Sequence, residues 1–238
     1  MIKDMLFLEE IDSTNSYCKA HFNEMSDGAV VYTLNQSAGR ARLGRIWSNT
    51  PGKALYLSQI VKTELVSPST LPLAASLAVE DALERMYGIT AQVKWPNDLL
   101  LSDKKLVGIL CESVPEGYII GVGVNVAQTQ AQLDAQGLEY ATSILIETGE
   151  CPRDIGALAL AISESFSSML ERFAKSGFAS LRGEYRARCI NLLHDVTAGE
   201  IKGKAVDINL DGHLVVRTDT GEEAVFTGEV SVGGIYGK

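Results

Sequence analysis

Gln36-Ser-Ala-Gly-Arg-Ala-Arg-Leu-Gly-Arg-Ile-Trp-Ser-Asn-Thr-Pro-Gly52 is the stretch on which the interpretation of this chain depends. It carries three glycines, three arginines and no acidic residue, although the formal net charge of the chain is -9. Glycine lets backbone N–H groups approach an anion closely, and guanidinium groups bind phosphate or carboxylate with paired donors. The stretch indicates a loop that closes over an anionic ligand, or equally an ordinary solvated loop with scattered arginines.

This loop does not contain the phosphate-binding P-loop motif, although Gly39 to Arg45 has its spacing. Arg45 stands where that motif needs lysine, and Ile46 stands where it needs serine or threonine. Without that hydroxyl the loop lacks the usual ligand for magnesium, so a different phosphate chemistry is needed.

The composition indicates a soluble globular protein that is long enough for one large domain or a large and a small one. The chain has 238 residues, of which 46% are hydrophobic and 21% charged. No apolar run approaches the roughly 18 residues of a membrane span, and the acidic N-terminus is no signal peptide, so we expect a cytoplasmic protein.

The net acidity argues against nucleic-acid binding. The cysteines have neither zinc-site nor disulfide spacing: Cys18, Cys111, Cys151 and Cys189.

Hydrophobic periodicity and turn residues predict alternating strands and helices, followed by a region of short strands. In the first part we expect strands at 4–11, 29–34, 54–62, about 90–94, 99–101, 106–112 and 118–126, and helices at about 15–25, 71–87, 155–175 and 178–189. From residue 192 short strands alternate with Gly-containing turns, which predicts a small β-barrel of strands 196–198, 204–208, 213–217 and 224–227.

Two further stretches carry polar residues next to predicted strands. In Lys94-Trp-Pro-Asn-Asp98 the proline interrupts a strand, so the lysine, asparagine and aspartate can contact phosphate, a base edge and hydrated magnesium. A plain strand-to-turn transition is the alternative. In Lys105-Leu-Val-Gly-Ile-Leu110 the lysine can lie at a pocket rim and Gly108 can let a flat ligand ring pack on the strand, unless the lysine is simply a solvated hairpin residue.

Taken together, these stretches resemble the biotin protein ligase family over nearly the whole chain, in the short form that lacks the N-terminal DNA-binding domain. No motif is specific alone, but their order and spacing agree with the family. The matching pieces are Asp12-Ser-Thr-Asn15, Gln36 to Trp47, Lys94 to Asp98, Lys105 to Leu110, Gly121-Val-Gly-Val-Asn125, Ala141-Thr-Ser143 and, near the C-terminus, Gly228-Glu-Val-Ser231.

The resemblance implies an α+β fold: a mixed sheet flanked by helices, as in class II aminoacyl-tRNA synthetases, over residues 1–190, and a C-terminal SH3-like barrel over 191–238. It implies a biotin–[acetyl-CoA-carboxylase] ligase that uses ATP and Mg²⁺. Biotin is activated as biotinyl-5′-AMP with release of pyrophosphate and then transferred to a lysine of a biotin carboxyl carrier protein or domain. Family members are often dimers through a sheet edge, so a homodimer is a further expectation.

Carried over by position, the resemblance also implies roles for individual residues. Arg40, Lys94 and Lys105 are expected to be catalytic, with Arg40 and Lys105 screening the repulsion between carboxylate and α-phosphate. Asp98 is expected in the outer shell of magnesium. The residues expected to bind biotin are Ser13, Thr14, Asn15, Gln36, Gly39, Arg40, Arg42, Lys105, Gly108 and Gly121. Those expected to bind ATP or the adenylate are Arg40, Arg42, Arg45, Trp47, Asn97 and Asn125, with Trp47 stacking on adenine.

One position departs from the family pattern, since Ala41 stands where the loop usually has glycine. If that position needs a positive φ, alanine costs about 1 kcal/mol; in an ordinary conformation it is neutral. Three other functions agree less well with the sequence. A DNA-binding regulator is disfavoured because the Ser13-Thr14 motif lies so close to the N-terminus. A lipoate or octanoate ligase fits Lys94 to Asp98 and the C-terminal barrel less well, and a catalytically dead biotin sensor would not need both Arg40 and Lys105.

Overall fold

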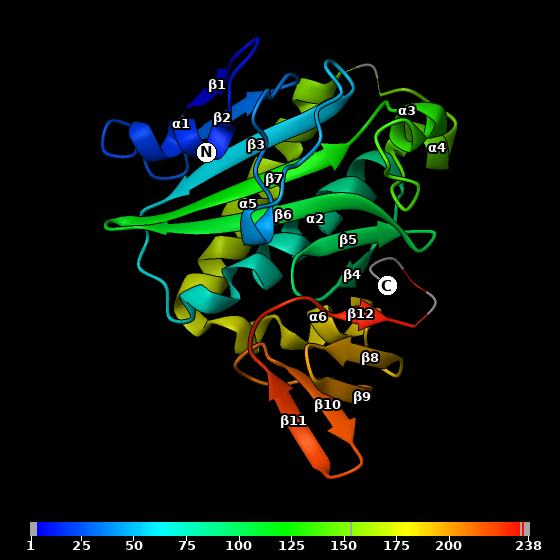
Figure 1. The fold of residues 1–238 in the computed structure, drawn as a ribbon. Helices are drawn as coiled ribbons and strands as arrows, with labels where there is room; N and C mark the ends of the chain where they lie inside the picture. The colour runs from blue at the N-terminus through cyan, green and yellow to red at the C-terminus, as the bar shows by residue number, and fades with distance from the viewer. Residues whose placement is uncertain (1–3, 153, 234, 236–238) are drawn as a thin grey trace.

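The structure is a computed structural model that describes residues 4–152, 154–233 and 235. Within these residues the chain forms a seven-stranded mixed sheet with helices and then a five-stranded antiparallel sheet (Figure 1). The order of the large sheet is β1-β2-β3-β7-β6-β5-β4. Its strands are β1 (Met5–Phe7), β2 (Val30–Thr33), β3 (Ala54–Val61), β4 (Gln92–Lys94), β5 (Asp98–Leu101), β6 (Lys104–Val114) and β7 (Gly117–Asn125). The predicted α+β fold is thereby confirmed.

The centre of the large sheet is a ladder of long antiparallel strands. β3 pairs with β7 and β7 with β6, whereas only the edge strand β1 runs parallel to its neighbour β2. Every residue of β3 is buried, as expected for a strand covered on both faces. β5 and β6 are joined by a two-residue turn in which Ser102 and Asp103 have φ values of 51° and 60°, the left-handed conformation of a tight hairpin turn.

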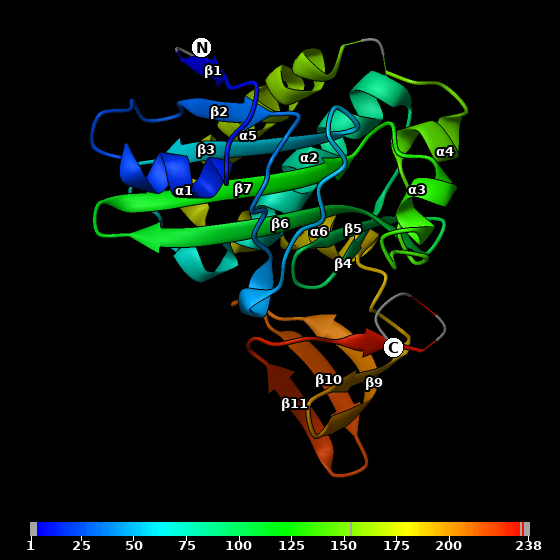
Figure 2. The ribbon, with the colours of Figure 1, turned by 45° about the horizontal axis from the view of Figure 1, so that its top comes forward.

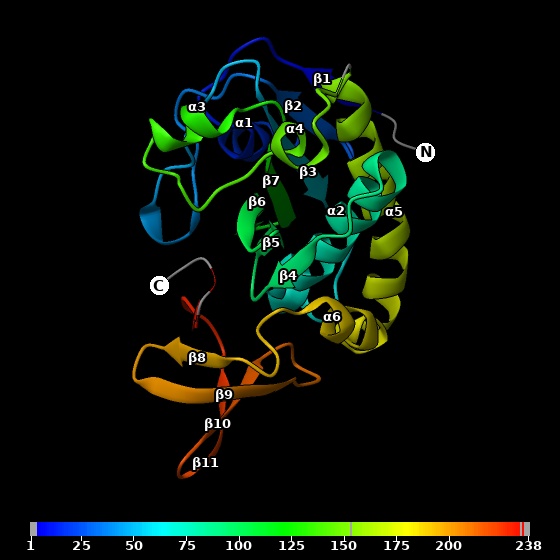
Figure 3. The same cartoon turned by 90° about the vertical axis from the view of Figure 1, so that its right-hand side faces the viewer.

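Two long helices cover one face of this sheet. Figure 3 shows α2 (Leu71–Tyr87) and α5 (Ile155–Ser176) on one side, and α1 (Thr14–Ala20) and α3 (Gln130–Asp134) on the other. α2 has the predicted bounds because its apolar residues follow a helical period and Gly88 ends it in the left-handed conformation, with φ 65°. On the α1 side, the segment between β2 and β3 crosses in front of β7 and β6 (Figure 2).

Several predicted elements have different bounds. The first strand spans only Met5–Phe7 rather than 4–11, and α1 ends at Ala20 because His21 already leaves the helical conformation. The predicted helix 178–189 is a 3₁₀ turn followed by α6 (Arg182–Arg188). α3 and α4 (Ile144–Thr148) were not predicted, since five residues are too few to show a helical period.

The C-terminal sheet consists of β8 (Asp195–Ala198), β9 (Ile201–Ile208), β10 (Leu214–Thr218), β11 (Gly221–Val225) and β12 (Ser231–Val232), in the order β11-β10-β9-β8-β12. It lies below β4 and α6 in Figure 1 and is joined to α6 by ion pairs of Arg182 and Arg186 with Asp207. Its buried side chains continue the hydrophobic core of the large sheet. Among the described helices, none combines the length and the apolar character that a membrane crossing requires.

Candidate functional site

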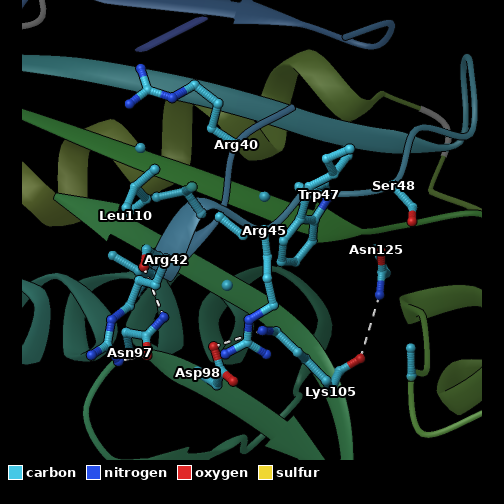
Figure 4. A pocket seen from close by; sticks show the side chains of 18 of the residues that line it. Arg40, Arg42, Arg45, Trp47, Ser48, Asn97, Asp98, Lys105, Leu110 and Asn125 are labelled. Carbon is cyan, nitrogen blue, oxygen red and sulfur yellow. Dashed lines mark hydrogen bonds and ion pairs between the residues drawn. The ribbon is translucent and has the colours of Figure 1, made fainter. Parts of the chain in front are cut away.

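A cavity of about 720 Å³ lies between β6, β7 and the segment 39–47, which we call the arginine loop. All the predicted site residues except Gly39 line this cavity. They come from the start of α1, from Gln36 and the arginine loop, and from β4 to β7, and residues 228–231, between β11 and the start of β12, complete the rim. Figure 4 shows part of this lining. The cavity has a neutral polar end and a cationic end.

The neutral end is built around the N-terminus of α1. Ser13 caps this helix, since its hydroxyl accepts a hydrogen bond from the backbone N–H of Ser16 at 3.4 Å. The backbone N–H of Thr14 donates to Gln36 Oε1 at 2.9 Å. Ser13, Thr14, Asn15 and Gln36 are all buried. These four side chains, all predicted to bind biotin, supply neutral donors and acceptors and no charge.

The cationic end is built around the Lys94–Asp98 stretch. Lys105 Nζ lies 2.8 Å from Asp98 Oδ1, and both side chains are largely buried. Lys94 is 7% exposed, so it brings a further cation into the same interior. Burial lowers the pKa of Lys94, and the positive charges of Lys105, Arg42 and Arg45 lower that pKa further, against the opposite effect of Asp98. A group of cations with one carboxylate among them favours a multiply charged anion.

Arg42 belongs to this end as well. It donates to Asn97 Oδ1 at 2.8 Å, and its pKa is lowered by burial, although Asp98 acts in the opposite direction. Asn97 in turn donates to the carbonyl of Ile109 at 3.0 Å, while Asn125 donates to the carbonyl of Lys105 at 3.4 Å (Figure 4). Both asparagines, predicted to contact the nucleotide, line the cavity and also hold its walls.

Trp47 lies across a pair of glycines between the two ends. Gly108 of β6 and Gly123 of β7 are register partners. A Cβ atom on Gly123 would lie 2.7 Å from Trp47 Cε2, and one on Gly108 would overlap the same indole. Gly108 was predicted to admit a flat ligand ring, whereas in this structure the ring packed against it is the indole of Trp47. Lys105 Nζ lies 5.3 Å from the indole centroid, which is within range of a cation–π contact.

The arginine loop is an ordered hairpin. The backbone N–H of Ala41 donates to the carbonyl of Arg45 at 2.8 Å, and the N–H of Trp47 donates to the carbonyl of Gly39 at 3.0 Å. The turn at its tip uses Leu43 and Gly44, with φ values of 57° and 71°. Ala41 itself has φ -125° and ψ 176°, an ordinary extended conformation, so alanine carries no backbone strain here. Gly39 packs closely, because a Cβ there would lie 2.6 Å from the carbonyl oxygen of Trp47.

The three arginines of the loop point to different partners. Arg42 also donates to the carbonyl of Gly228 at 3.1 Å, and Arg45 forms an ion pair with Glu229, so the loop is joined to the segment between β11 and β12. Arg40 instead pairs with Glu112 at 2.7 Å, and Figure 4 shows it directed away from Arg45. Arg40 and Lys105, which were predicted to act together, therefore have separate partners in this structure.

Sequence reasoning missed two residues around the site. Ser58 of β3 donates from its buried hydroxyl toward Asn15, and Glu112 of β6 binds both Asn15 and Arg40. A signal existed for Glu112, because residues 108, 110 and 112 of one strand share a face. An acidic residue on the same face as Gly108 pointed to the site, whereas nothing in the buried pattern of β3 singled out Ser58.

Comparison with known protein families gives two matches. The Biotin/lipoate A/B protein ligase family matches residues 7–126, and the Biotin protein ligase C terminal domain matches residues 191–233. The second match covers the strands of the C-terminal sheet, β8 to β12.

Three similar proteins extend along nearly the whole chain. A biotin–[acetyl-CoA-carboxylase] ligase of Paracoccus denitrificans is 31% identical and covers 95% of this chain and 100% of its own length. The structure of the Aquifex aeolicus biotin protein ligase with biotin and ATP has 30% identity and a TM-score of 0.85, covering 97% of this chain and 98% of that one. The Leishmania major biotin protein ligase with biotinyl-5-AMP has 25% identity and a TM-score of 0.63, covering 93% and 98%.

These matches distinguish a biotin ligase from a lipoate or octanoate ligase. The family that matches residues 7–126 includes both biotin and lipoate ligases, whereas the match over residues 191–233 and the full-length relatives are biotin enzymes. The prediction of a biotin ligase is confirmed: the chain belongs to the biotin protein ligase family.

Proposed function

We propose that this chain activates biotin with ATP at the cavity described above and passes the biotinyl group to a lysine of a biotin carboxyl carrier protein or domain. The observation that carries the proposal is the division of one cavity into a neutral end and a cationic end. Biotin has an uncharged ureido head and a carboxylate tail, and ATP has a polyanionic triphosphate. A cavity that joins the carboxylate of one to the α-phosphate of the other needs this distribution of charge.

At the neutral end, Ser13, Thr14, Asn15 and Gln36 would hold the ureido head by hydrogen bonds. An uncharged heterocycle binds best to directional neutral groups, since burying an unpaired charge beside it would be costly. Gly121 keeps this end open, because a Cβ there would overlap the amide of Asn15. Gly108, which lines the cavity, would form part of the wall along which the biotin tail runs toward Lys105.

At the cationic end, the first step joins two groups that are both negatively charged. The biotin carboxylate attacks the α-phosphorus, an oxygen–phosphorus bond forms, and the bond to pyrophosphate breaks. Lys94, Lys105, Arg42 and Arg45 would screen the repulsion between these groups and the charge that develops on the phosphoryl oxygens. Trp47, Asn97 and Asn125 would contact the nucleotide, and Arg40 would join them only after leaving Glu112.

Magnesium belongs to the proposal as the partner of the triphosphate. Among the described residues, no group of three or more His, Cys, Asp or Glu side chains is placed to hold a metal ion. The Asp98 carboxylate lies against Lys105, which fits contact with the metal through water better than direct coordination. When bound, magnesium would supply additional positive charge at the phosphates.

The second step is the attack of a lysine amine on the mixed anhydride, which releases AMP. This anhydride is reactive, so the chief task of the protein is to exclude water until the acceptor lysine arrives. The ordered arginine loop, joined at its tip to Gly228 and Glu229, lies at the cavity and is suited to that task. We place the reaction in the cytoplasm, consistent with the free state of all four cysteines.

Pyrophosphate exchange into ATP tests the proposal, with biotin, lipoate and octanoate offered separately. We expect exchange with biotin alone. Lys105→Met should reduce the exchange at least about 100-fold, because it removes a cation from the reacting groups. Lys104→Met is the matched control: Lys104 is the neighbouring residue of β6, donates to Gln130, and should be replaceable with little effect. Exchange with lipoate or octanoate but not with biotin would contradict the proposal.

A further inference from the structure

Glu112 links the arginine loop to the neutral end of the cavity. One of its carboxylate oxygens accepts a hydrogen bond from Arg40 at 2.7 Å, and the other accepts one from Asn15 Nδ2 at 2.8 Å. The side chain of Glu112 is only 17% exposed, so both contacts are shielded from water on most sides. Charge-assisted hydrogen bonds of this kind are among the stronger ones in proteins.

The donor and acceptor roles around Asn15 follow from this carboxylate. An ionised carboxylate can only accept, so the Asn15 amide must turn its NH₂ group toward Glu112 and its oxygen toward Ser58. Ser58 Oγ lies 2.6 Å from Asn15 Oδ1 and 2.7 Å from Thr14 Oγ1. With one proton to give, Ser58 donates to Asn15 Oδ1, which can only accept. Thr14 Oγ1, which also donates to Gln36 Oε1 at 3.2 Å, is the second neighbour of the Ser58 hydroxyl. Glu112 thus sets the direction of the hydrogen bonds at the neutral end.

The same carboxylate holds the loop at a point far from its tip. Near the tip, Arg42 and Arg45 bind the segment between β11 and β12. Arg40 lies at the base of the hairpin, where its backbone forms an isolated β-bridge with Ile46. Its guanidinium forms an ion pair with Glu112 of β6. The loop is therefore held by interactions at two places. The Arg40–Glu112 ion pair at its base lies next to the residues proposed to bind the head of biotin.

We propose that Glu112 is a positioning residue that keeps the arginine loop closed over the neutral end and orients Asn15 for the biotin head. Naming biotin as the ligand rests on the proposed function. The role of the Arg40–Glu112 ion pair in holding the loop does not depend on it. Glu112 holds the loop through Arg40 and orients Asn15 beside the biotin head. Removing the Glu112 carboxylate should therefore speed the dissociation of biotin. It should have a smaller effect on the adenylation rate at saturating substrates.

Glu112→Gln tests this inference, because it keeps the shape of the side chain and removes the charge. In the ligand-free enzyme we expect trypsin to cut the arginine loop at least about fivefold faster. The rate of biotin dissociation without ATP should rise about tenfold, as for the loss of a charge-assisted hydrogen bond. The kcat for pyrophosphate exchange at saturating biotin and ATP should change less than about threefold. Glu116→Gln is the matched control, since it makes the same charge change at the exposed turn of the β6–β7 hairpin.

Unchanged proteolysis and unchanged biotin dissociation in folded Glu112→Gln protein would overturn the inference. A second variant covers the case of poor folding. Arg40→Gln removes the other half of the pair and should also speed biotin dissociation, and adding Glu112→Gln to it should have a smaller effect than in the native background. Full additivity would overturn the inference. If the native enzyme did not bind biotin at all, the proposed function would fail instead, and the proteolysis would still test the role of Glu112.

Discussion

Trp95 donates its indole N–H to the carbonyl oxygen of Gly212 at 2.9 Å, from the Lys94–Asp98 stretch to the C-terminal sheet. Its backbone N–H also donates to Asn191 Oδ1 at 2.7 Å, and its side chain is 3% exposed. The tryptophan of this stretch is thus an anchor between the two sheets, while Lys94 and Asp98 on either side of it face the cavity.

Trp95→Phe should therefore destabilise the protein. Phenylalanine keeps an aromatic ring but leaves the Gly212 carbonyl without its partner in a buried place, which costs about 1–3 kcal/mol of unfolding free energy. Urea denaturation followed by circular dichroism measures this. The same change should reduce adenylation less than Lys105→Met does, because it removes no charge from the cavity and the indole N–H is directed to Gly212. A variant as stable as the native protein would contradict the anchoring role.

Gly123→Ala should weaken ATP binding. The new Cβ would lie 2.7 Å from Trp47 Cε2, so the indole proposed to contact the nucleotide must move from its place over β6 and β7. Overpacking of this kind costs about 1–3 kcal/mol, and we expect a rise in the KM for ATP of about tenfold or more. Gly183→Ala is the control, because a Cβ there meets nothing within 4 Å. Equal KM values for ATP in the two variants would show that the position of Trp47 is unimportant for the nucleotide.

Much of this fold could be predicted from the sequence where periodicity and turn residues agree. The bounds of α2 were predicted correctly because apolar residues recur through Leu83 and Gly88 then ends the helix. The strands around Gly108 and Gly123 were likewise identified by their apolar runs. The predicted polar residues of the neutral end do come together. Thr14, at the start of α1, donates its backbone N–H to Gln36, which precedes the arginine loop.

The directions of side chains in the arginine loop could not be predicted in this way. Whether Arg40 faces Lys105 or Glu112 depends on contacts between residues more than 60 positions apart, and the sequence alone does not show them. The same holds for Trp47, whose place over Gly108 depends on the pairing of β6 with β7. Side chains of an irregular segment follow the tertiary structure rather than a local period.

Ala41→Gly should leave adenylation almost unchanged. Ala41 already has an extended conformation that any residue adopts, so glycine relieves no strain there. Glycine instead adds freedom to the unfolded chain, which lowers the unfolding free energy by about 0.5–1 kcal/mol. We expect a kcat for pyrophosphate exchange within about twofold of the native value. A large gain in rate would mean that the loop passes through a left-handed conformation at this position during closure.

Lys94→Met should raise stability while lowering activity. Burial holds the pKa of Lys94 below the ordinary lysine value of 10.5. Between that lowered pKa and 10.5 the unfolded state binds more protons, so the unfolding free energy of the native protein rises with pH in this window. Below the window the full cost of burying the charge is present. Methionine removes that cost, and we expect a gain of about 1 kcal/mol at neutral pH.

The activity of the same variant should move in the opposite direction. Without Lys94 the cationic end loses a charge that faces the phosphates in the proposed mechanism, so pyrophosphate exchange should fall about 100-fold. Urea denaturation at several pH values between 7 and 10 should show a smaller slope for Lys94→Met than for the native protein, and Lys104→Met serves as the control for the loss of a less buried lysine. A destabilised variant with native activity would show that Lys94 supports the fold rather than the reaction.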